Sequence, residues 1–353
     1  MPTELSLNVL SSLGMEVPLP KIDRALRELW ETDNAKTRAS LMNFAIYSED
    51  ITSMERNNQL LERITADHAC RALHIVCLPA AQPQRARAWI NALCRPYQSG
   101  KMVCSEQITF VLEGGDDSLV QNIVFAHLDS DLPLVVWWQG DLTHNFQERF
   151  YSRIQLLIVD SSTWTNPAAE FARICEARGE APYLFDVRDL SWTRSHFMRT
   201  ALANCFQDAR ARELLPQIAK IEVTHAPDHR CAAVLLASWL AQRLGAQPAE
   251  PAKGVSFVKP DGGSICVELH ECGAGCALRE LTVSGQGICV RISRDSASPF
   301  VHTCATCEGH SHQEVLPADV VTDADLVSEQ LSRAGGNTHY ASLLPWMPIM
   351  LGR

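Results

Sequence analysis

The stretch Leu132–Trp138 (LPLVVWW) decides the fold of this chain. It is apolar almost throughout, which is typical of a strand that is covered on both faces of a sheet. Further strands are predicted at Leu41–Tyr47, Arg71–Leu78 and Ile154–Val159, and helical patterns lie between them. Strands that alternate with helices predict a mostly parallel sheet with helices on both faces.

The spacing of apolar residues predicts the other helices and strands in the first half of the chain. Apolar residues at helical spacing predict helices at Lys21–Glu31, near Met54–Ala66 and near Gln84–Leu93. Strands are expected at Met102–Leu112 and Tyr183–Val187. We therefore expect an α/β domain over residues 1–210.

The character of the chain changes after residue 210. Ile218–Thr224 predicts a strand, and Asp228 is interpreted as the cap of a helix. Residues 246–253 (AQPAEPAK) have the composition of a linker. Short strands with turn signals then follow from 255 to 293 and predict an antiparallel meander. We expect residues 211–353 to form a smaller α+β domain.

The bulk properties exclude several classes of protein. The 353 residues carry a net charge of −10, which argues against nucleic-acid binding, because that needs a basic surface. The first twenty residues do not resemble an export signal, and no apolar run is long enough to span a membrane. We therefore expect a cytoplasmic protein with no nucleic acid and no membrane among its partners.

Polar segments follow three of the predicted strands. Because ligands sit beyond the carboxyl ends of strands in open α/β sheets, these segments predict a crevice that binds a ligand or a partner. Arginine supplies a fork for carboxylate or phosphate there. The alternative is that the aspartates are helix caps and that the tryptophans are core residues. The candidates are Trp138, Asp141, Asp160, Ser161, Asp189, Trp192 and Arg194.

Motifs for cofactor chemistry and covalent catalysis are missing from the sequence. There is no GxxxxGK[ST], no GxGxxG between a strand and a helix, and no GxSxG elbow. We therefore expect no nucleotide cofactor and no catalytic centre.

Thirteen cysteines divide into two sets. Seven are scattered among apolar neighbours, and without an export signal we expect them to be reduced, buried thiols. Six lie between Cys266 and Cys307, where three interpretations stay open. The thiols are inert, or Cys304 forms a redox-switchable pair with Cys307 or one of these two pairs with Cys272 or Cys276, or a structural zinc site uses Cys304, Cys307 and two of Cys272, Cys276, His310 and His312. The candidates for redox or metal chemistry are Cys272, Cys276, Cys304 and Cys307.

Five stretches of the chain form a specific combination by their order and spacing. They are Lys36–Tyr47 (KTRASLMNFAIY), Ile64–Val76 (ITADHACRALHIV), Asp131–Asp141 (DLPLVVWWQGD), Leu157–Ser162 (LIVDSS) and Asp189–Arg194 (DLSWTR). Together they resemble the glucose-6-phosphate dehydrogenase assembly proteins (the OpcA family). Leu343–Arg353 (LLPWMPIMLGR) is also similar to the closing segment of that family, whereas Ala69-Cys70 departs from the Pro-Ser that is usual there.

The resemblance implies a protein that is not itself an enzyme. It implies a partner that binds glucose-6-phosphate dehydrogenase and promotes its assembly or allosteric activation, at the entry to the oxidative pentose phosphate pathway. The alternative function is a sensor or cryptic enzyme that binds a sugar phosphate in the crevice near Trp138, Asp160 and Arg194. The resemblance implies no catalytic residues.

Overall fold

The chain forms two compact units in the computed structural model, and each is described by itself. Unit 1 comprises Met1–Val159, Glu176–Arg188 and Asp323–Gly336, and unit 2 comprises Asp160–Cys175, Asp189–Thr322 and Asn337–Arg353. The structure describes residues 12–31, 36–38, 40–81, 83–96, 102–114, 117–180, 185–249, 254–273, 275–296, 298–319, 322–333, 335 and 337–352.

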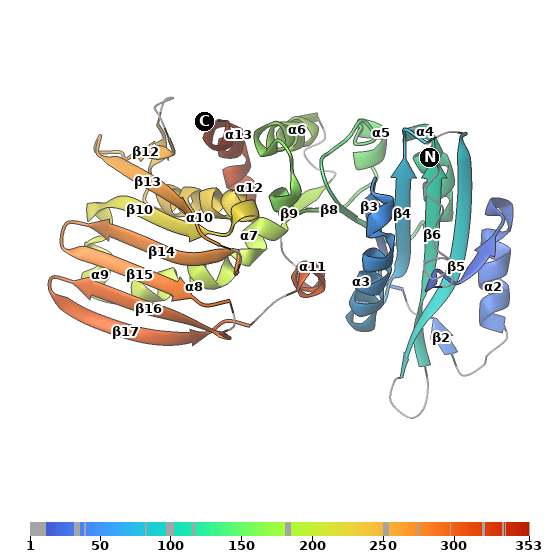
Figure 1. Cartoon of the computed structure of the whole chain (residues 1–353), viewed down its shortest axis with the longest axis horizontal. Helices are drawn as coiled ribbons and strands as arrows, with labels where there is room; N and C mark the ends of the chain where they lie inside the picture. Colours follow the sequence, from blue (N-terminus) through green and yellow to red (C-terminus); the bar gives the residue numbers. More distant parts are fainter. Residues whose placement is uncertain are drawn as a thin grey trace. The chain divides into compact units, whose positions relative to one another are not determined.

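Unit 1 is built on a nine-stranded sheet with the order β1-β5-β6-β4-β3-β7-β8-β9, and β2 also pairs with β6 (Figure 1). The strand pairs from β6 to β8 are parallel, whereas β1 and β5 run antiparallel. The predicted fold class is confirmed. The strands are β1 (Met15–Val17), β2 (Lys36–Arg38), β3 (Asn43–Ser48), β4 (Arg71–Leu78), β5 (Arg85–Pro96), β6 (Met102–Glu113), β7 (Leu134–Trp138), β8 (Leu156–Val159) and β9 (Asp186–Asp189).

The order of the six central strands has a consequence for function. Read in chain order from β3, they run 3-2-1-4-5-6 across the sheet, which is the order of doubly wound dinucleotide-binding folds. The order in which successive strands are added reverses between β3 and β7, which are parallel neighbours. In such sheets the ligand crevice lies at the carboxyl ends of the strands that flank this switch point.

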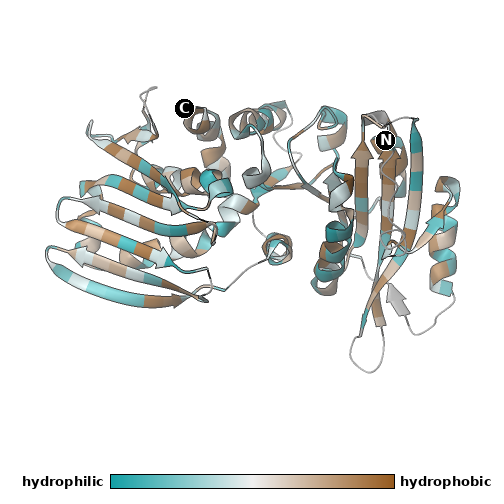
Figure 2. Cartoon of the chain, viewed as in Figure 1, coloured by the Kyte–Doolittle hydropathy of each residue, from teal (hydrophilic) through white to brown (hydrophobic). Residues whose placement is uncertain are grey.

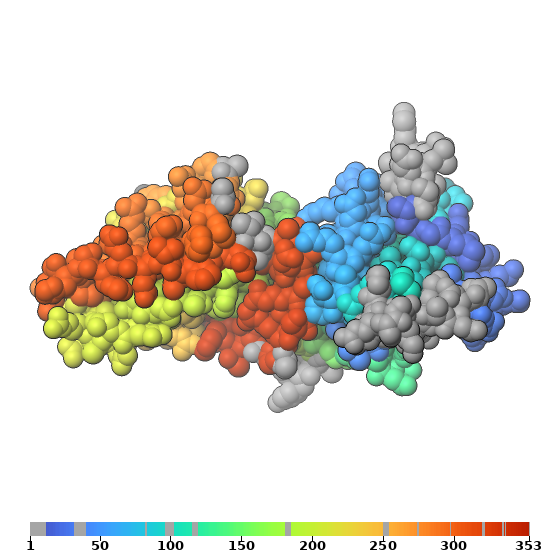
Figure 3. Space-filling model, turned by 90° about the horizontal axis from the view of Figure 1, so that it is seen from below, coloured from blue at the N-terminus to red at the C-terminus, as the bar shows by residue number. Residues whose placement is uncertain are grey.

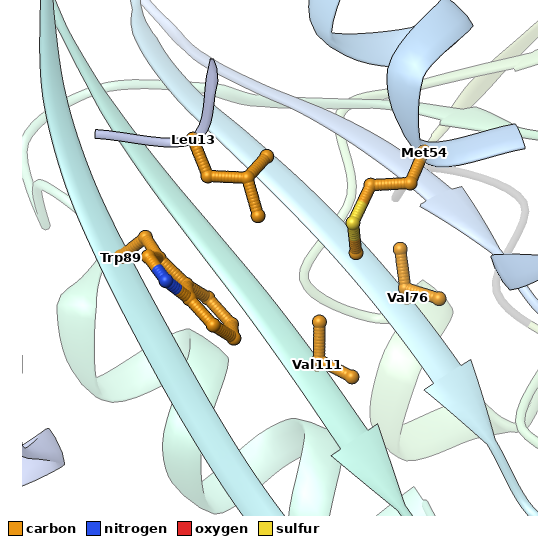
Figure 4. Packing of buried hydrophobic residues seen from close by; sticks show 5 residues of the cluster. All are labelled: Leu13, Met54, Val76, Trp89 and Val111. Atoms are coloured by element: carbon orange, nitrogen blue, oxygen red, sulfur yellow. The ribbon is translucent and has the colours of Figure 1, made fainter. Parts of the chain in front are cut away.

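Apolar side chains from several elements form the core of unit 1. Figure 2 shows that β4 and β6 are hydrophobic along most of their length, as expected of strands covered on both faces. One cluster lies beneath α3 (Met54–Asp67), as Figure 4 shows. The other helices of this unit include α2 (Ile22–Glu31), α4 (Asp117–Val124) and α5 (Glu148–Tyr151). The cluster consists of Leu13, Met54, Val76, Trp89 and Val111.

The helix predicted near Gln84–Leu93 is wrong, because this segment is the long strand β5. Its twelve residues pair antiparallel with β6 in unbroken register. The alternation of Arg85 and Arg87 with alanines is a period of two, which is typical of a strand. Pairing with β6 stabilises the strand over the weaker helical pattern.

A disulfide between Cys94 and Cys104 crosses from β5 to β6 at a directly opposed pair of residues. The expectation that both are reduced thiols is therefore wrong. The other eleven cysteines are free. Sequence reasoning missed the bond because it did not place residues 85–96 in a strand.

The disulfide predicts a thiol count. Alkylation of the denatured, unreduced chain should modify eleven cysteines, and prior reduction should raise the number to thirteen, as measured by intact mass. The variant Cys94→Ser frees Cys104, so all of its remaining cysteines should react without reduction. Thirteen reactive thiols in the unreduced native chain would contradict the bond.

Unit 2 contains an eight-stranded sheet with the order β11-β12-β13-β10-β14-β15-β16-β17 (Figure 1). Only β10 and β13 pair in parallel, so the predicted antiparallel meander is confirmed over most of the sheet. The strands are β10 (Ile218–His225), β11 (Gln247–Pro248), β12 (Ser256–Val258), β13 (Ser264–Glu271), β14 (Leu278–Gly285), β15 (Ile288–Arg294), β16 (Phe300–Cys307) and β17 (His310–Pro317).

Two sequence interpretations change in this unit. The predicted linker contributes the short strand β11, and its residues 250–253 lie outside the described residues. The Cys- and His-rich segment, for which no strand was predicted, forms the hairpin of β16 and β17. Alternation in β16 places Val301, Thr303 and Ala305 on the covered face of the sheet.

Helices cover one face of this sheet. α8 (His196–Cys205) packs on β15 and β16, and α10 (Arg230–Arg243) packs on β10 and β13. The N-cap of α10 is His229 and not Asp228, which lies in the preceding 3-10 turn. The remaining helices are α6 (Pro167–Glu180), α7 (Leu190–Arg194), α9 (Ala209–Glu213), α12 (Thr338–Leu343) and α13 (Met347–Leu351).

Helix α11 (Asp323–Ser332) belongs to unit 1, although it follows the strands of unit 2 in the chain. It packs against α3. The buried guanidinium of Arg188 donates to the carbonyl oxygens of Gln330, Arg333 and Gly335. These contacts place Asp323–Gly336 in unit 1. The sequence predicted a single domain boundary after residue 210 instead.

Candidate functional site

The switch point of the unit 1 sheet is closed by aromatic side chains. Tyr47, near the end of β3, stacks on Trp138 at the end of β7, with ring centroids 3.9 Å apart. Phe146 and Phe150 meet the Trp138 ring edge-on at 5.5 and 5.4 Å. Trp138 is only 1% exposed, so the alternative that it is a core residue is correct.

The carboxylate of Glu49 lies beside this aromatic cluster and accepts several hydrogen bonds. The Tyr47 hydroxyl donates to it at 2.7 Å, the Asn145 amide donates at 3.1 Å, and Thr143 is a third donor. Burial, with the nearby Cys77 and Glu49, raises the pKa of Tyr47 far above its usual range. Tyr47 is therefore a permanent donor to Glu49.

The next residue, Asp50, caps the helical segment that leads into α3. Its carboxylate accepts from the backbone N–H of Thr52 at 2.8 Å at the start of the 3-10 turn Ile51–Ser53. In a dinucleotide-binding sheet this position belongs to a glycine-rich turn whose free N–H groups bind the pyrophosphate. The turn here has no glycine and carries two carboxylates, so its residues do not fit a dinucleotide phosphate.

The exit of β7 is also occupied by contacts within unit 1. Gln139 and Asn57 exchange two side-chain amide hydrogen bonds of 2.9 Å. The indole N–H of Trp138 donates to the carbonyl oxygen of Asp141 at 2.9 Å. Trp138 and Asp141 therefore stabilise the turn after β7, while the other five crevice candidates lie in unit 2.

Asp160 and Arg194 form a paired ion bridge in unit 2. Two parallel hydrogen bonds of 2.7 Å join the guanidinium to the carboxylate, and both side chains are about nine-tenths buried. Burial opposes the ionisation of Asp160, but the hydrogen bonds and the charge of Arg194 outweigh it and hold the pKa of Asp160 below its usual value. The pair is therefore charged at neutral pH.

Asp189 is completely buried beside this pair. Its Oδ1 accepts from the backbone N–H groups of Ser161 at 3.1 Å and Ser191 at 2.9 Å. Its Oδ2 has no hydrogen-bond partner among the described residues. Burial, followed by the charge of Asp160, raises the pKa of Asp189 to about 7.

The five candidates of unit 2 thus come together, but their contacts are internal. Asp160 and Asp189 cap the helical turns that follow β8 and β9. Trp192 is 2% exposed and carries the Arg199 guanidinium 3.6 Å above its ring. The guanidinium of Arg194 is paired with Asp160. This arrangement favours the capping interpretation over an open crevice for a sugar phosphate.

The switch-point network of Tyr47, Glu49 and Asn145 was missed from the sequence. The available signal was the polar run Ser48-Glu49-Asp50, which directly follows a predicted strand. Only the strand order shows that this run lies at the switch point.

The cysteine candidates are placed on different faces of the unit 2 sheet. Cys304 and Cys307 are three residues apart in β16, so they point to opposite faces. The Sγ atom of Cys304 lies 3.6 Å from the Ser311 hydroxyl, whereas burial and the charge of Asp208 raise the pKa of Cys307. These two thiols are not brought together as a redox pair.

The other two candidate cysteines do lie near each other. Cys272 and Cys276 line one cavity of about 360 Å³, together with Arg279, Arg294 and His302. Burial raises the pKa of Cys276, which keeps this thiol protonated. The predicted pairing of Cys304 or Cys307 with Cys272 or Cys276 stays a prediction.

Three possible metal ligands lie within 4.8 Å of one another at one place in the described part of the chain, and they are Glu222, Glu268 and His270. The ammonium group of Lys220 lies 2.9 Å from both carboxylates. This cluster therefore contains its own cation. None of the four candidate cysteines belongs to it, and structural zinc stays a prediction without a matching cluster.

Fold and site together define a class of α/β protein. It has the strand order of dinucleotide-binding folds and a switch point that is closed by its own aromatic and acidic side chains. None of the described helices is long and apolar enough to cross a membrane.

Comparison with known sequence families identifies the chain further. The family described as "Glucose-6-phosphate dehydrogenase subunit N-terminal domain" matches residues 61–176, and the corresponding C-terminal domain matches residues 186–344. The chain belongs to this family, the OpcA family of glucose-6-phosphate dehydrogenase assembly proteins, as its motifs predicted.

Several relatives are named "Putative OxPP cycle protein OpcA". The protein of Synechocystis sp. is 25% identical over 64% of this chain and 47% of its own length. The protein of Synechococcus elongatus is 22% identical over 86% and 73%, and that of Nostoc punctiforme is 23% identical over 60% and 44%. The chain thus spans about half the length of two of these relatives.

Two solved structures are distantly similar. An aldose-aldose oxidoreductase from Caulobacter crescentus has a TM-score of 0.46 at 11% identity, over 88% of this chain and 96% of the other. KijD10, a 3-ketoreductase from Actinomadura kijaniata, has a TM-score of 0.47 at 10% identity, over 88% and 95%. Similarity at this level carries no conclusion about function.

Proposed function

We propose that this chain is a non-catalytic partner of glucose-6-phosphate dehydrogenase that promotes its assembly or activation in the oxidative pentose phosphate pathway. Membership of the assembly family supports glucose-6-phosphate dehydrogenase as the binding partner. The names of the curated relatives support the pathway.

The observation that carries the non-catalytic part is the pair of carboxylates at the switch point. Glu49 and Asp50 lie in the turn after β3, where dinucleotide-binding folds bind the pyrophosphate of the cofactor. Both are held by hydrogen bonds from Tyr47, Asn145 and the backbone of Thr52. An anionic cofactor would meet like charge there and lose the free N–H donors that it needs.

Activation by such a partner has a simple thermodynamic form. The chain must bind the active state of the dehydrogenase more tightly than the inactive state. A coupling free energy of about 1–3 kcal/mol, which is typical of allosteric pairs, corresponds to about a 5–150-fold shift in apparent affinity. The same coupling makes the active dehydrogenase bind this chain more tightly.

The proposal is tested by mixing the purified chain with the dehydrogenase of the same cell. We expect the two to migrate together in size-exclusion chromatography with a mass above that of either alone. The initial rate at limiting glucose 6-phosphate should rise when the chain is added in equimolar amount. Separate migration together with an unchanged rate would overturn the proposal.

A binding screen distinguishes a partner from a cryptic enzyme or a metabolite sensor. Neither NAD(P) nor glucose 6-phosphate, at about 1 mM, should shift the melting temperature of the chain alone, because a ligand stabilises only a protein that binds it. The dehydrogenase in the same screen is the positive control. A concentration-dependent shift of the chain would support the sensor alternative.

A further inference from the structure

The strand β17 is an exposed edge of the unit 2 sheet. In the described part of the chain it pairs with β16 and is the last strand of the sheet. Seven of its eight residues are exposed and the eighth, Leu316, is partly exposed. Figure 1 shows it as the outermost strand, and Figure 3 shows its orange-red atoms on the surface beside the yellow-green helices α8 and α9.

The two edge strands of this sheet differ in how well they are protected from pairing with another strand. The opposite edge is β11, which is two residues long and contains Pro248, so it offers little backbone for pairing. The edge at β17 is eight residues long, contains no lysine, and has its only proline at the last position. Val315 is a large apolar side chain that is 55% exposed. An unprotected edge of this length is a template for another strand.

The hydrogen bonds of β17 show which backbone groups face outward. Pro317 pairs with Phe300, and the adjacent Ala318 N–H donates to the Pro299 carbonyl at 2.8 Å. Pro317 is therefore in a non-hydrogen-bonded pair with β16, and alternate residues share its orientation. The backbone N–H and C=O groups of Ser311, Gln313 and Val315 point to the free edge.

We propose that β17 pairs antiparallel with β17 of a second copy of this chain, with Gln313 on the two-fold axis. This register places Gln313 opposite itself and Ser311 opposite Val315, so that about six backbone hydrogen bonds form. It joins the two sheets into one. The contact is isologous, so it closes as a dimer and leaves no further edge at this end.

The side chains of β17 are complementary to themselves in this register. Residues 312 and 314 lie opposite each other, so the His312 imidazole of each copy faces the Glu314 carboxylate of the other. Within one chain the two groups are already 3.8 Å apart. An imidazole N–H that donates to a carboxylate on the opposite strand stabilises an antiparallel ladder.

Other registers lose this complementarity. An axis at residue 312 or 314 brings His312 or Glu314 opposite its own copy. An axis at 312 also pairs Val315 with residue 309, which lies beyond the end of β17, and an axis at 314 pairs Ser311 with Pro317, which has no backbone N–H. The register centred on Gln313 is the one in which all three outward-facing residues and both His–Glu pairs are used.

The first test removes one outward-facing donor. The variant Gln313→Pro deletes a backbone N–H that faces away from β16, so the fold of the chain should be preserved. Sedimentation velocity of the full chain, over about a hundredfold range of concentration from micromolar upward, should show a monomer–dimer equilibrium for the native chain. The variant should remain monomeric over this range, and its melting temperature should equal that of the native chain at concentrations where the native chain is monomeric.

The second test breaks and then restores the pairs of His312 with Glu314. His312→Glu sets carboxylates opposite each other twice and should weaken the dimer about tenfold. The double variant H312E/E314H exchanges the two groups and should return the dissociation constant to within about threefold of the native value. A monomeric native chain, a dimer that Gln313→Pro leaves intact, or a double variant as weak as His312→Glu would each overturn the proposal.

These experiments measure the chain alone. Their outcome is therefore independent of whether it binds glucose-6-phosphate dehydrogenase.

Discussion

Replacing Arg194 with methionine should lower the free energy of unfolding by about 3–5 kcal/mol, because it leaves the buried Asp160 carboxylate without its cation. The two hydrogen bonds of 2.7 Å that join these groups are lost together. Urea unfolding followed by tryptophan fluorescence measures the effect. Methionine preserves much of the length and apolar surface of the arginine stem, so the change reports mainly the charge.

The matched control for this prediction removes both partners. Arg194→Met combined with Asp160→Asn leaves no unpaired charge, so the double variant should recover most of the lost stability. The pairing also has a defined pH window. Because the pKa of Asp160 is held below its unfolded value, its contribution is complete above about pH 4 and fades as the pH falls further. A single variant as stable as the native chain would contradict the buried bridge.

Substitutions of Asp189 should separate its hydrogen bonds from its charge. Asp189→Ala leaves the N–H groups of Ser161 and Ser191 without an acceptor and should cost about 2–4 kcal/mol near pH 4, where the contribution of the native Asp189 is complete. Asp189→Asn keeps an oxygen for these donors and cannot ionise. The asparagine variant should therefore be much more stable than the alanine variant.

The pH dependence of Asp189 has the opposite sign to that of Asp160. Its pKa is raised to about 7, so the folded state holds a proton that the unfolded state releases near pH 4. The stability contributed by this group is complete below about pH 4 and falls as the pH rises to about 7. The unfolding free energy of Asp189→Asn should not show this decrease with pH. The measurement compares the unfolding free energies of the variant and the native chain from pH 5 to 8. Parallel curves would contradict the shifted pKa.

Local pattern was a sufficient guide for the central strands of unit 1. The apolar strand at 134–138 and its parallel neighbours were predicted from composition alone, because a strand covered on both faces has to be apolar along its length. The pattern failed for β5, where a weak helical spacing was preferred to the alternation of Arg85 and Arg87 with alanines. Pairing with β6 decided between them.

Of the seven residues that sequence reasoning proposed for one crevice, the five that lie in unit 2 come together in the structure, and they bond to one another. Asp160, Asp189 and Arg194 follow strands, and the carboxyl ends of neighbouring strands meet at one edge. Whether such a group stays open or bonds to itself depends on distances across the fold. The double hydrogen bond between Asp160 and Arg194 settles this point for the described structure.

The sequence by itself determined the fold class and the family of this protein, because both depend on short runs of residues such as DLPLVVWW and DLSWTR. The tertiary structure decided which residues share a place in space. It paired Tyr47 with Trp138, placed Glu49 and Asp50 at the switch point, returned α11 to unit 1, and put Cys304 and Cys307 on opposite faces. These outcomes depend on strand order, register and long-range pairing, which periodicity along the chain does not encode.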